Sequence, residues 1–125
     1  MRFTPAAVAL SLAFGLTASV LHSAPSQVLD PRAAALESLG KTALATGNVQ
    51  GAIDHFEAAL TVQPGAVVIM LDLADANRRQ GLQGKALHYY RAALGQDSQN
   101  IDAIAGEGLA LVEKGAIEKA KRSLS

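Results

Sequence analysis

The chain has 125 residues, half of them hydrophobic, with eleven basic and eleven acidic side chains and no cysteine. A formal net charge of zero argues against a surface for nucleic acid or anionic membranes, because both need a concentrated basic patch. The lack of cysteine excludes a disulfide framework, a thiolate metal site and a lipid-modified cysteine in this chain.

Residues 1–23 differ in kind from the rest of the sequence. Arg2 gives a short positive start, no charged residue occurs from Ala6 to Leu21, and small and polar residues follow. This order is typical of a secretory signal peptide. The apolar run is shorter than the ~20 residues that comfortably span a bilayer. We therefore expect cleavage after Ser23 and export of the chain.

Two other interpretations of this segment stay open. The apolar run can remain uncleaved and tether the chain to a membrane, which the intact mass of the purified protein would reveal. It can also be an apolar first helix of a cytosolic protein, although a charge-free segment of this kind is hard to place in a helical core.

The next segment, residues 24–32, predicts a linker that leads into a helix. Asp30 can cap free backbone N–H groups, and Pro31 suits a first helical turn. Gly47 predicts the end of this helix, because glycine tolerates a left-handed backbone.

Three further helices are expected downstream, over about 49–62, 66–80 and 83–96. Pro64 ends the first of them, since proline donates no backbone hydrogen bond and restricts the residue before it. Asn100 is a suitable cap for the helix that follows.

The helical pattern recurs at an interval of 34 residues without any insertion. Gly47, Gly81 and Gly115 each begin a similar segment, and a fixed period of this length indicates a repeat architecture. The equivalent positions include Ala52, Ala86 and Ala120, and likewise Phe56, Tyr90 and Leu124. By this alignment, Gly115 opens a second helix in a third unit.

The repeat resembles the tetratricopeptide repeat (TPR), a helix–turn–helix motif of 34 residues. The residues that carry the resemblance are Leu36, Leu39, Gly40, Ala52, Phe56, Ala59 and Pro64 in the first unit, Met70, Leu73, Ala74, Ala86, Tyr90 and Ala93 in the second, and Ile104, Gly108, Leu111, Ala120 and Leu124 in the third. Two positions depart from it, Ser98 in place of Pro64 and Glu107 in place of Leu39 and Leu73.

The resemblance implies an all-α solenoid over residues 33–125, with two full repeats at 33–66 and 67–100 and a truncated third at 101–125. Solenoids of this kind need about three stacked units for stability. Either the last helix is short, or the reading frame is an incomplete copy of a longer protein; we favour the second. A regulatory domain of a larger enzyme is one form that such a longer protein can take.

No residue pattern indicates catalysis, a cofactor or a metal ion. His55 and His88 lie on helices of successive units without the three or four convergent ligands that a metal needs. Asp72 and Asp75 lack a neighbouring base, and an exposed polar helix face explains them better. We therefore expect a protein that is not an enzyme.

The resemblance instead implies a partner-binding groove lined by the first helix of each unit. The candidates are Glu37, Lys41, Leu44, Leu71, Asp75, Arg78, Arg79, Ala105, Leu109 and Val112. Some TPR proteins hold a carboxyl terminus with a clamp of basic and asparagine side chains. This chain does not resemble them, because the acidic Glu37, Asp72 and Asp102 stand among those positions.

We therefore expect an exported interaction module. The short signal segment and the usual setting of the family favour a bacterial periplasm. It would bind a peptide or helix of an envelope protein, with no nucleic acid and no cofactor. Membrane contact is expected only if the N-terminal segment stays uncleaved. Unpaired solenoid ends can also stack on one another, so self-association of the chain stays open.

Overall fold

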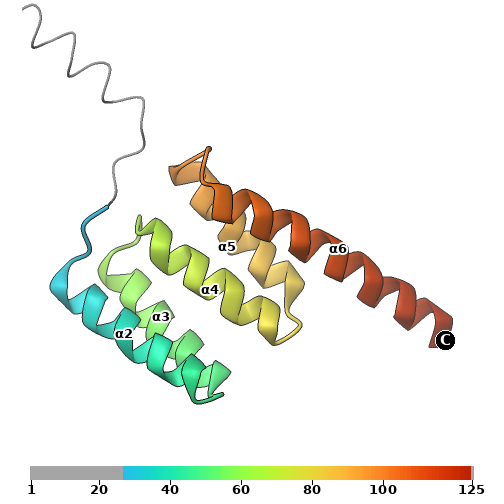
Figure 1. Ribbon diagram of the computed structural model, residues 1–125, viewed down its shortest axis with the longest axis horizontal. Helices are drawn as coiled ribbons and strands as arrows, with labels where there is room; N and C mark the ends of the chain where they lie inside the picture. Colours follow the sequence, from blue (N-terminus) through green and yellow to red (C-terminus); the bar gives the residue numbers. More distant parts are fainter. Residues whose placement is uncertain (1–26, 125) are drawn as a thin grey trace, which may run out of the picture.

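The computed structural model describes residues 27–124, which form five helices and no strand (Figure 1). The helices are α2 (Pro31–Ala45), α3 (Val49–Val62), α4 (Val67–Arg79), α5 (Gln83–Gln96) and α6 (Ile101–Leu124). The expected signal peptide, residues 1–23, lies outside the described residues. None of the described helices is both long enough and apolar enough to cross a membrane.

The helices form two antiparallel hairpins followed by a single long helix. Helix α2 pairs with α3 and α4 pairs with α5, and α6 packs on the second hairpin (Figure 1). This arrangement confirms the expected all-α repeat solenoid. The first helix of each unit is α2, α4 or α6, which we call the A helices; α3 and α5 are the B helices.

The helix ends follow the local sequence signals. The Asp30 carboxylate accepts a hydrogen bond from the Arg32 amide at 2.9 Å, and Asn48 and Asn100 cap α3 and α6 in the same way. Gly47 and Gly81 end the A helices with φ angles of +83° and +78°. Glycine is the residue that adopts this left-handed backbone without steric cost.

The core lies between the A and B helices. Phe56, Ile69 and Leu73 are its largest fully buried side chains. The Phe56 ring of α3 fills the space over Gly40 of α2, where a Cβ atom would collide with it. The contact between a small residue on α2 and a large one on α3 thus sets how closely these two helices approach each other.

One expected turn is not formed. Helix α6 continues through Gly115, where the repeat alignment predicts a break between two helices. Two sequence differences explain this: Ala116 replaces the capping Asn48, and Lys121 replaces the buried Ile53 and Leu87. With a weaker cap and a smaller apolar face to bury, the segment gains less from folding back than from continuing the helix.

The segment before α2 is tied to the α3–α4 turn by side-chain hydrogen bonds. The Gln63 side chain accepts from the Asp30 amide at 2.7 Å and donates to the Val28 carbonyl. The Gln27 side chain accepts from the Val67 amide at 2.8 Å. These bonds fix the entry of the chain into the first hairpin.

Candidate functional site

Charged side chains of the A helices gather in two clusters. The first, which we call the Glu37 cluster, consists of Glu37, Lys41 and Asp72. Lys41 Nζ lies 2.6 Å from Glu37 Oε1 within α2, and Asp72 of α4 interacts electrostatically with both. Glu37, expected as a groove residue, is buried and already paired, so Lys41 is the member that a ligand can reach.

The pKa of Asp72 is unusually high for a carboxyl group. Burial raises its pKa from 3.8 to about 7, and the carboxylates of Glu37 and Asp75 add to that effect, while Lys41 opposes it. Removing a carboxylate from water disfavours its charged form, and this effect of burial is the largest one on Asp72. The α2–α4 junction therefore holds a carboxyl group that changes its charge near neutral pH.

The second group, the Arg78 cluster, consists of Asp75, Arg78, Arg79, Gln83 and Glu113. Arg78 lies 2.8 Å from Asp75 and 3.0 Å from Glu113 of α6, and so joins two A helices. Arg79 lies 3.0 Å from Asp75, and Gln83 of α5 donates to Glu113 at 2.9 Å. The hydrogen bond to Asp75 is the main reason why the pKa of Arg78 lies above its ordinary value.

Three buried polar atoms of the described residues have no hydrogen-bond partner: Asp72 Oδ2, Arg78 Nε and Gln83 Oε1. All three belong to the two clusters. Buried polar groups without a partner cost free energy, and each calls for an explanation such as a bound group. Two of them, Asp72 Oδ2 and Arg78 Nε, lie on the A helix α4, and Gln83 at the start of α5 borders it.

The apolar groove candidates are placed differently from one another. Leu44 packs against the first core cluster, and Leu71 lies between the cores of the second hairpin and α6. Leu109 and Val112 of α6 are exposed. The structure therefore brings Lys41, Arg79, Leu109 and Val112 to the surface, and it uses Glu37, Leu44, Leu71 and Arg78 largely in packing and pairing.

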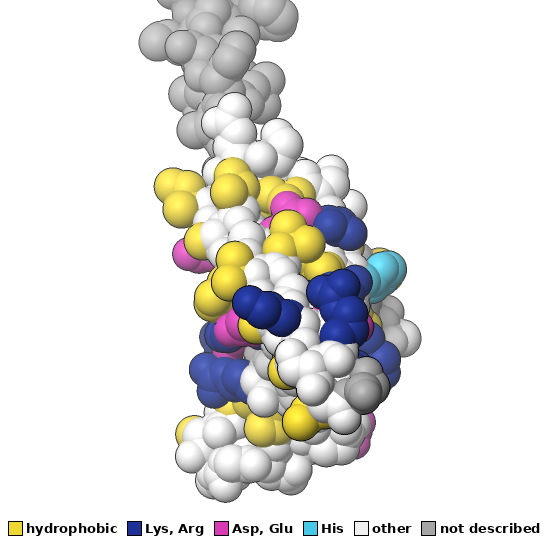
Figure 2. Space-filling model, turned by 90° about the vertical axis from the view of Figure 1, so that its right-hand side faces the viewer, with side chains coloured by type: hydrophobic (Ala, Val, Ile, Leu, Met, Phe, Trp, Pro, Cys, Tyr) yellow, Lys and Arg dark blue, Asp and Glu magenta, His cyan; other side chains and the backbone are white. Residues whose placement is uncertain are grey.

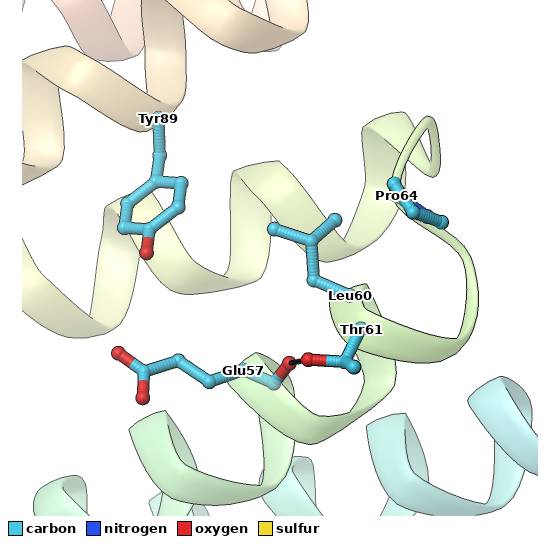
Figure 3. Close-up of a pocket in the computed structure, with 5 residues that line it drawn as sticks. All are labelled: Glu57, Leu60, Thr61, Pro64 and Tyr89. Atoms are coloured by element: carbon cyan, nitrogen blue, oxygen red, sulfur yellow. Dashed lines mark hydrogen bonds between the residues drawn. The ribbon is translucent and has the colours of Figure 1, made fainter.

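The B helices carry a hollow that the sequence does not predict. It has a volume of about 460 Å³ and is lined by Glu57, Leu60, Thr61, Pro64 and Tyr89. Figure 3 shows Tyr89 of α5 pointing toward α3, with the Glu57 carboxylate extending toward its hydroxyl group. Burial and the Glu57 charge raise the pKa of Tyr89. Of these residues, the sequence predicts a role only for Pro64, as a helix end.

The histidines are not brought together with other ligating side chains. His55 is half-buried and His88 is exposed and stacks edge-on against Tyr89, with ring centroids 5.2 Å apart. Across residues 27–124, no group of three or more His, Cys, Asp or Glu side chains is placed to hold a metal ion.

The paired helices and the charged A-helix side define a helical-repeat protein of the solenoid class. Comparison with protein families matches residues 37–101, just over half of the chain, to the tetratricopeptide repeat. The chain belongs to the tetratricopeptide repeat family.

Two solved structures illustrate the likeness of fold. The first TPR domain of Spaghetti (RPAP3), bound to the HSP90 peptide SRMEEVD, is 22% identical with a TM-score of 0.67, over 76% of this chain and 77% of that one. The Sgt2 TPR domain from Aspergillus fumigatus is 26% identical with a TM-score of 0.68, over 80% of this chain and 66% of that one. Comparison with curated proteins gave no match.

Proposed function

We propose that the chain is an exported protein–protein interaction module that binds a peptide or helix of an envelope protein along the A helices. The observation that carries this proposal is that the three buried polar atoms without a hydrogen-bond partner among the described residues all lie in the Glu37 and Arg78 clusters. Function in this family of folds depends on such surface groups rather than on the fold itself.

The exposed groups on this side suggest the character of the ligand. Lys41 and Arg79 keep more than half of their side-chain surface in water, while Leu109 and Val112 offer apolar contacts on α6. A ligand segment with an apolar side chain and a carboxylate or polar group one or two turns away matches this set. Interfaces of this kind depend on a few anchors inside a polar rim.

A carboxyl-terminal peptide such as the HSP90 segment bound by RPAP3 is a poorer match. Asp72 and Asp102 are acidic residues among the positions that would have to hold a terminal carboxylate. Glu37, at another of these positions, forms an ion pair with Lys41. Like charges in contact disfavour such a ligand by repulsion and desolvation. We therefore favour an internal segment of the partner.

A photo-crosslinking experiment in the intact cell envelope tests this proposal. The full chain would carry a photoreactive residue at Leu109 or, as the control, at Leu82, which is similarly exposed but lies on the α4–α5 turn. The proposal expects one dominant envelope protein captured from position 109, lost on Arg79→Glu and absent from position 82. Equal capture from both positions would contradict it.

Export itself is a second part of the proposal. Fractionation followed by intact-mass measurement would find a chain that begins at Ala24 in the periplasm. A full-length chain in the membrane fraction would support the alternative of a tethered assembly factor, and a full-length chain in the cytoplasm would contradict export. A longer product from the same gene would support the alternative that these repeats belong to a larger protein.

A further inference from the structure

Helix α6 exposes an apolar face that no described element covers. Of the ten large hydrophobic side chains exposed among residues 27–124, six belong to α6. Ile101, Ile104 and Leu111 share one side of the helix with Gly108, because residues three and four positions apart lie above one another. We call these four residues the outer face of α6.

Figure 2 shows the molecule from the side toward which α6 extends, and hydrophobic side chains gather there among Lys and Arg. Ile101 is 79% exposed, Ile104 52% and Leu111 46%. A cluster of large apolar side chains on one helix marks an interaction surface more often than isolated exposed residues do.

The repeat indicates what such a face accepts. The equivalent positions of α2 are Leu36, Gly40 and Ala43, and α3 covers them, with the Phe56 ring directly over Gly40. At Gly108, by contrast, an added Cβ atom would meet nothing within 4 Å. The outer face of α6 therefore has the shape that receives a helix, with a glycine hollow suited to one large side chain.

We propose that this face binds the same face of a second copy of the chain, in an antiparallel pair of α6 helices. A register that sets Ile104 of one copy over Gly108 of the other also sets Ile101 opposite Leu111. The pattern is self-complementary, as a two-fold interface requires, because each contact occurs twice. Ile104 would fill the glycine hollow as Phe56 fills the hollow at Gly40.

The charges next to the face agree with this pairing. In the same register, Lys114 of one copy lies level with the α5–α6 turn of the other, which carries Asp97. Opposite charges thus meet at both ends of the contact, which favours the antiparallel orientation. Leu109 and Glu113 point to a different side of α6, so the pair leaves them open to a ligand, while Val112, one turn from Gly108, borders the contact.

Crosslinking through a single introduced cysteine tests the pairing, because the chain has no cysteine of its own. The two-fold axis would pass near Gly106, so Ala105→Cys in the full chain should give a covalent dimer with a short bis-maleimide. Ala58→Cys, exposed on α3, is the control and should remain monomeric. A dimer from both variants would indicate unspecific association and overturn the proposal.

A second pair of variants locates the interface by sedimentation. Ile104→Glu should abolish the concentration-dependent increase in mass, since it places a charge over the glycine hollow. Leu39→Glu, at the other end of the solenoid and equally exposed at 51%, should leave that increase unchanged. The proposal would fail if the parent chain stayed monomeric, or if Leu39→Glu rather than Ile104→Glu dissociated the dimer. The proposal would also fail if Ile104→Glu destabilised the monomer itself, because the face would then be covered within a single chain.

Discussion

At the scale of single residues, the solenoid combines tight contacts between glycines and rings with a few costly polar groups. Gly106 of α6 approaches Tyr90 as closely as Gly40 of α2 approaches Phe56. Asp72 is held where its charge is disfavoured, and its Oδ2 atom lacks a partner among the described residues. Packing and electrostatics at these residues can each be tested by one substitution.

Asp72→Asn should stabilise the protein at pH 8 and have little effect at pH 4. The folded chain raises the pKa of Asp72 from 3.8 to about 7. Below pH 3.8 the carboxyl group of Asp72 is protonated in both the folded and the unfolded chain, so it does not lower the free energy of unfolding. As the pH rises from 3.8 to about 7, the unfolded chain ionises more readily, so the folded chain loses stability. After discounting for partial exposure, we expect a gain of about 1–2 kcal/mol at pH 8.

Urea denaturation at the two pH values measures this difference. Asp54→Asn, on the exposed side of α3, is the control and should change the free energy of unfolding equally little at both. A loss of stability at pH 8 on Asp72→Asn would show that the attraction between Asp72 and Lys41 outweighs burial, contrary to the account.

Gly106→Ala and Gly108→Ala should change stability in opposite directions, although they lie two residues apart in one helix. A Cβ at Gly106 collides with the Tyr90 ring, whereas one at Gly108 meets nothing. The first should lower the free energy of unfolding by about 1–2 kcal/mol, since overpacking exceeds the gain in helix propensity. The second should raise it by up to ~1 kcal/mol.

Thermal and urea denaturation at low protein concentration, where single copies predominate, would measure both glycine variants. Equal effects of the two substitutions would show that Tyr90 does not pack on α6 as described.

At the scale of the helices, the sequence predicted more about α2 to α5 than about α6. The 34-residue interval, Asp30, Gly47 and Pro64 located the first four helices, and α3 and α5 have the expected bounds. The continuity of α6 could not be predicted from Gly115 alone. Gly81 forms a turn even without a capping side chain, so the outcome depends on how much apolar surface the next helix can bury.

Gly115→Ala tests the continuity of α6. In a continuous helix, alanine at this position should stabilise by up to ~1 kcal/mol and increase the helical circular dichroism signal. Gly81→Ala is the matched control, because Gly81 has a φ of +78°; alanine there should destabilise by about 1–2 kcal/mol. A destabilising Gly115→Ala would indicate that the chain turns at this residue after all.

The candidate site was predictable only in part, for a physical reason. Helical periodicity identifies which residues share a side of a helix, and two of the candidates implied by the resemblance, Arg79 and Leu109, are exposed in the structure. It does not reveal contacts between helices. The burial of Glu37, the bridge from Arg78 to Glu113 and the hollow beside Tyr89 all depend on how the hairpins stack.

At the scale of the whole molecule, the two sides of the solenoid have different chemistry. The A helices carry charged clusters and the exposed Leu109 and Val112, while the B helices present the hollow around Tyr89. Because no described element covers the outer face of α6, the same short solenoid can offer a ligand surface and an adjoining surface for a second copy. These two roles predict independent effects of substitutions on α4 and on the outer face of α6.

The most direct test of the A-helix surface is the affinity of the captured partner segment for matched charge-reversal variants, measured by isothermal titration calorimetry. Arg79→Glu should weaken binding about tenfold or more, as loss of a charged anchor at an interface does. Lys85→Glu, an equally drastic change on the exposed side of α5, should leave the affinity within a factor of about two. The reverse order, with Lys85→Glu the damaging change, would place the binding surface on the B helices and contradict the account.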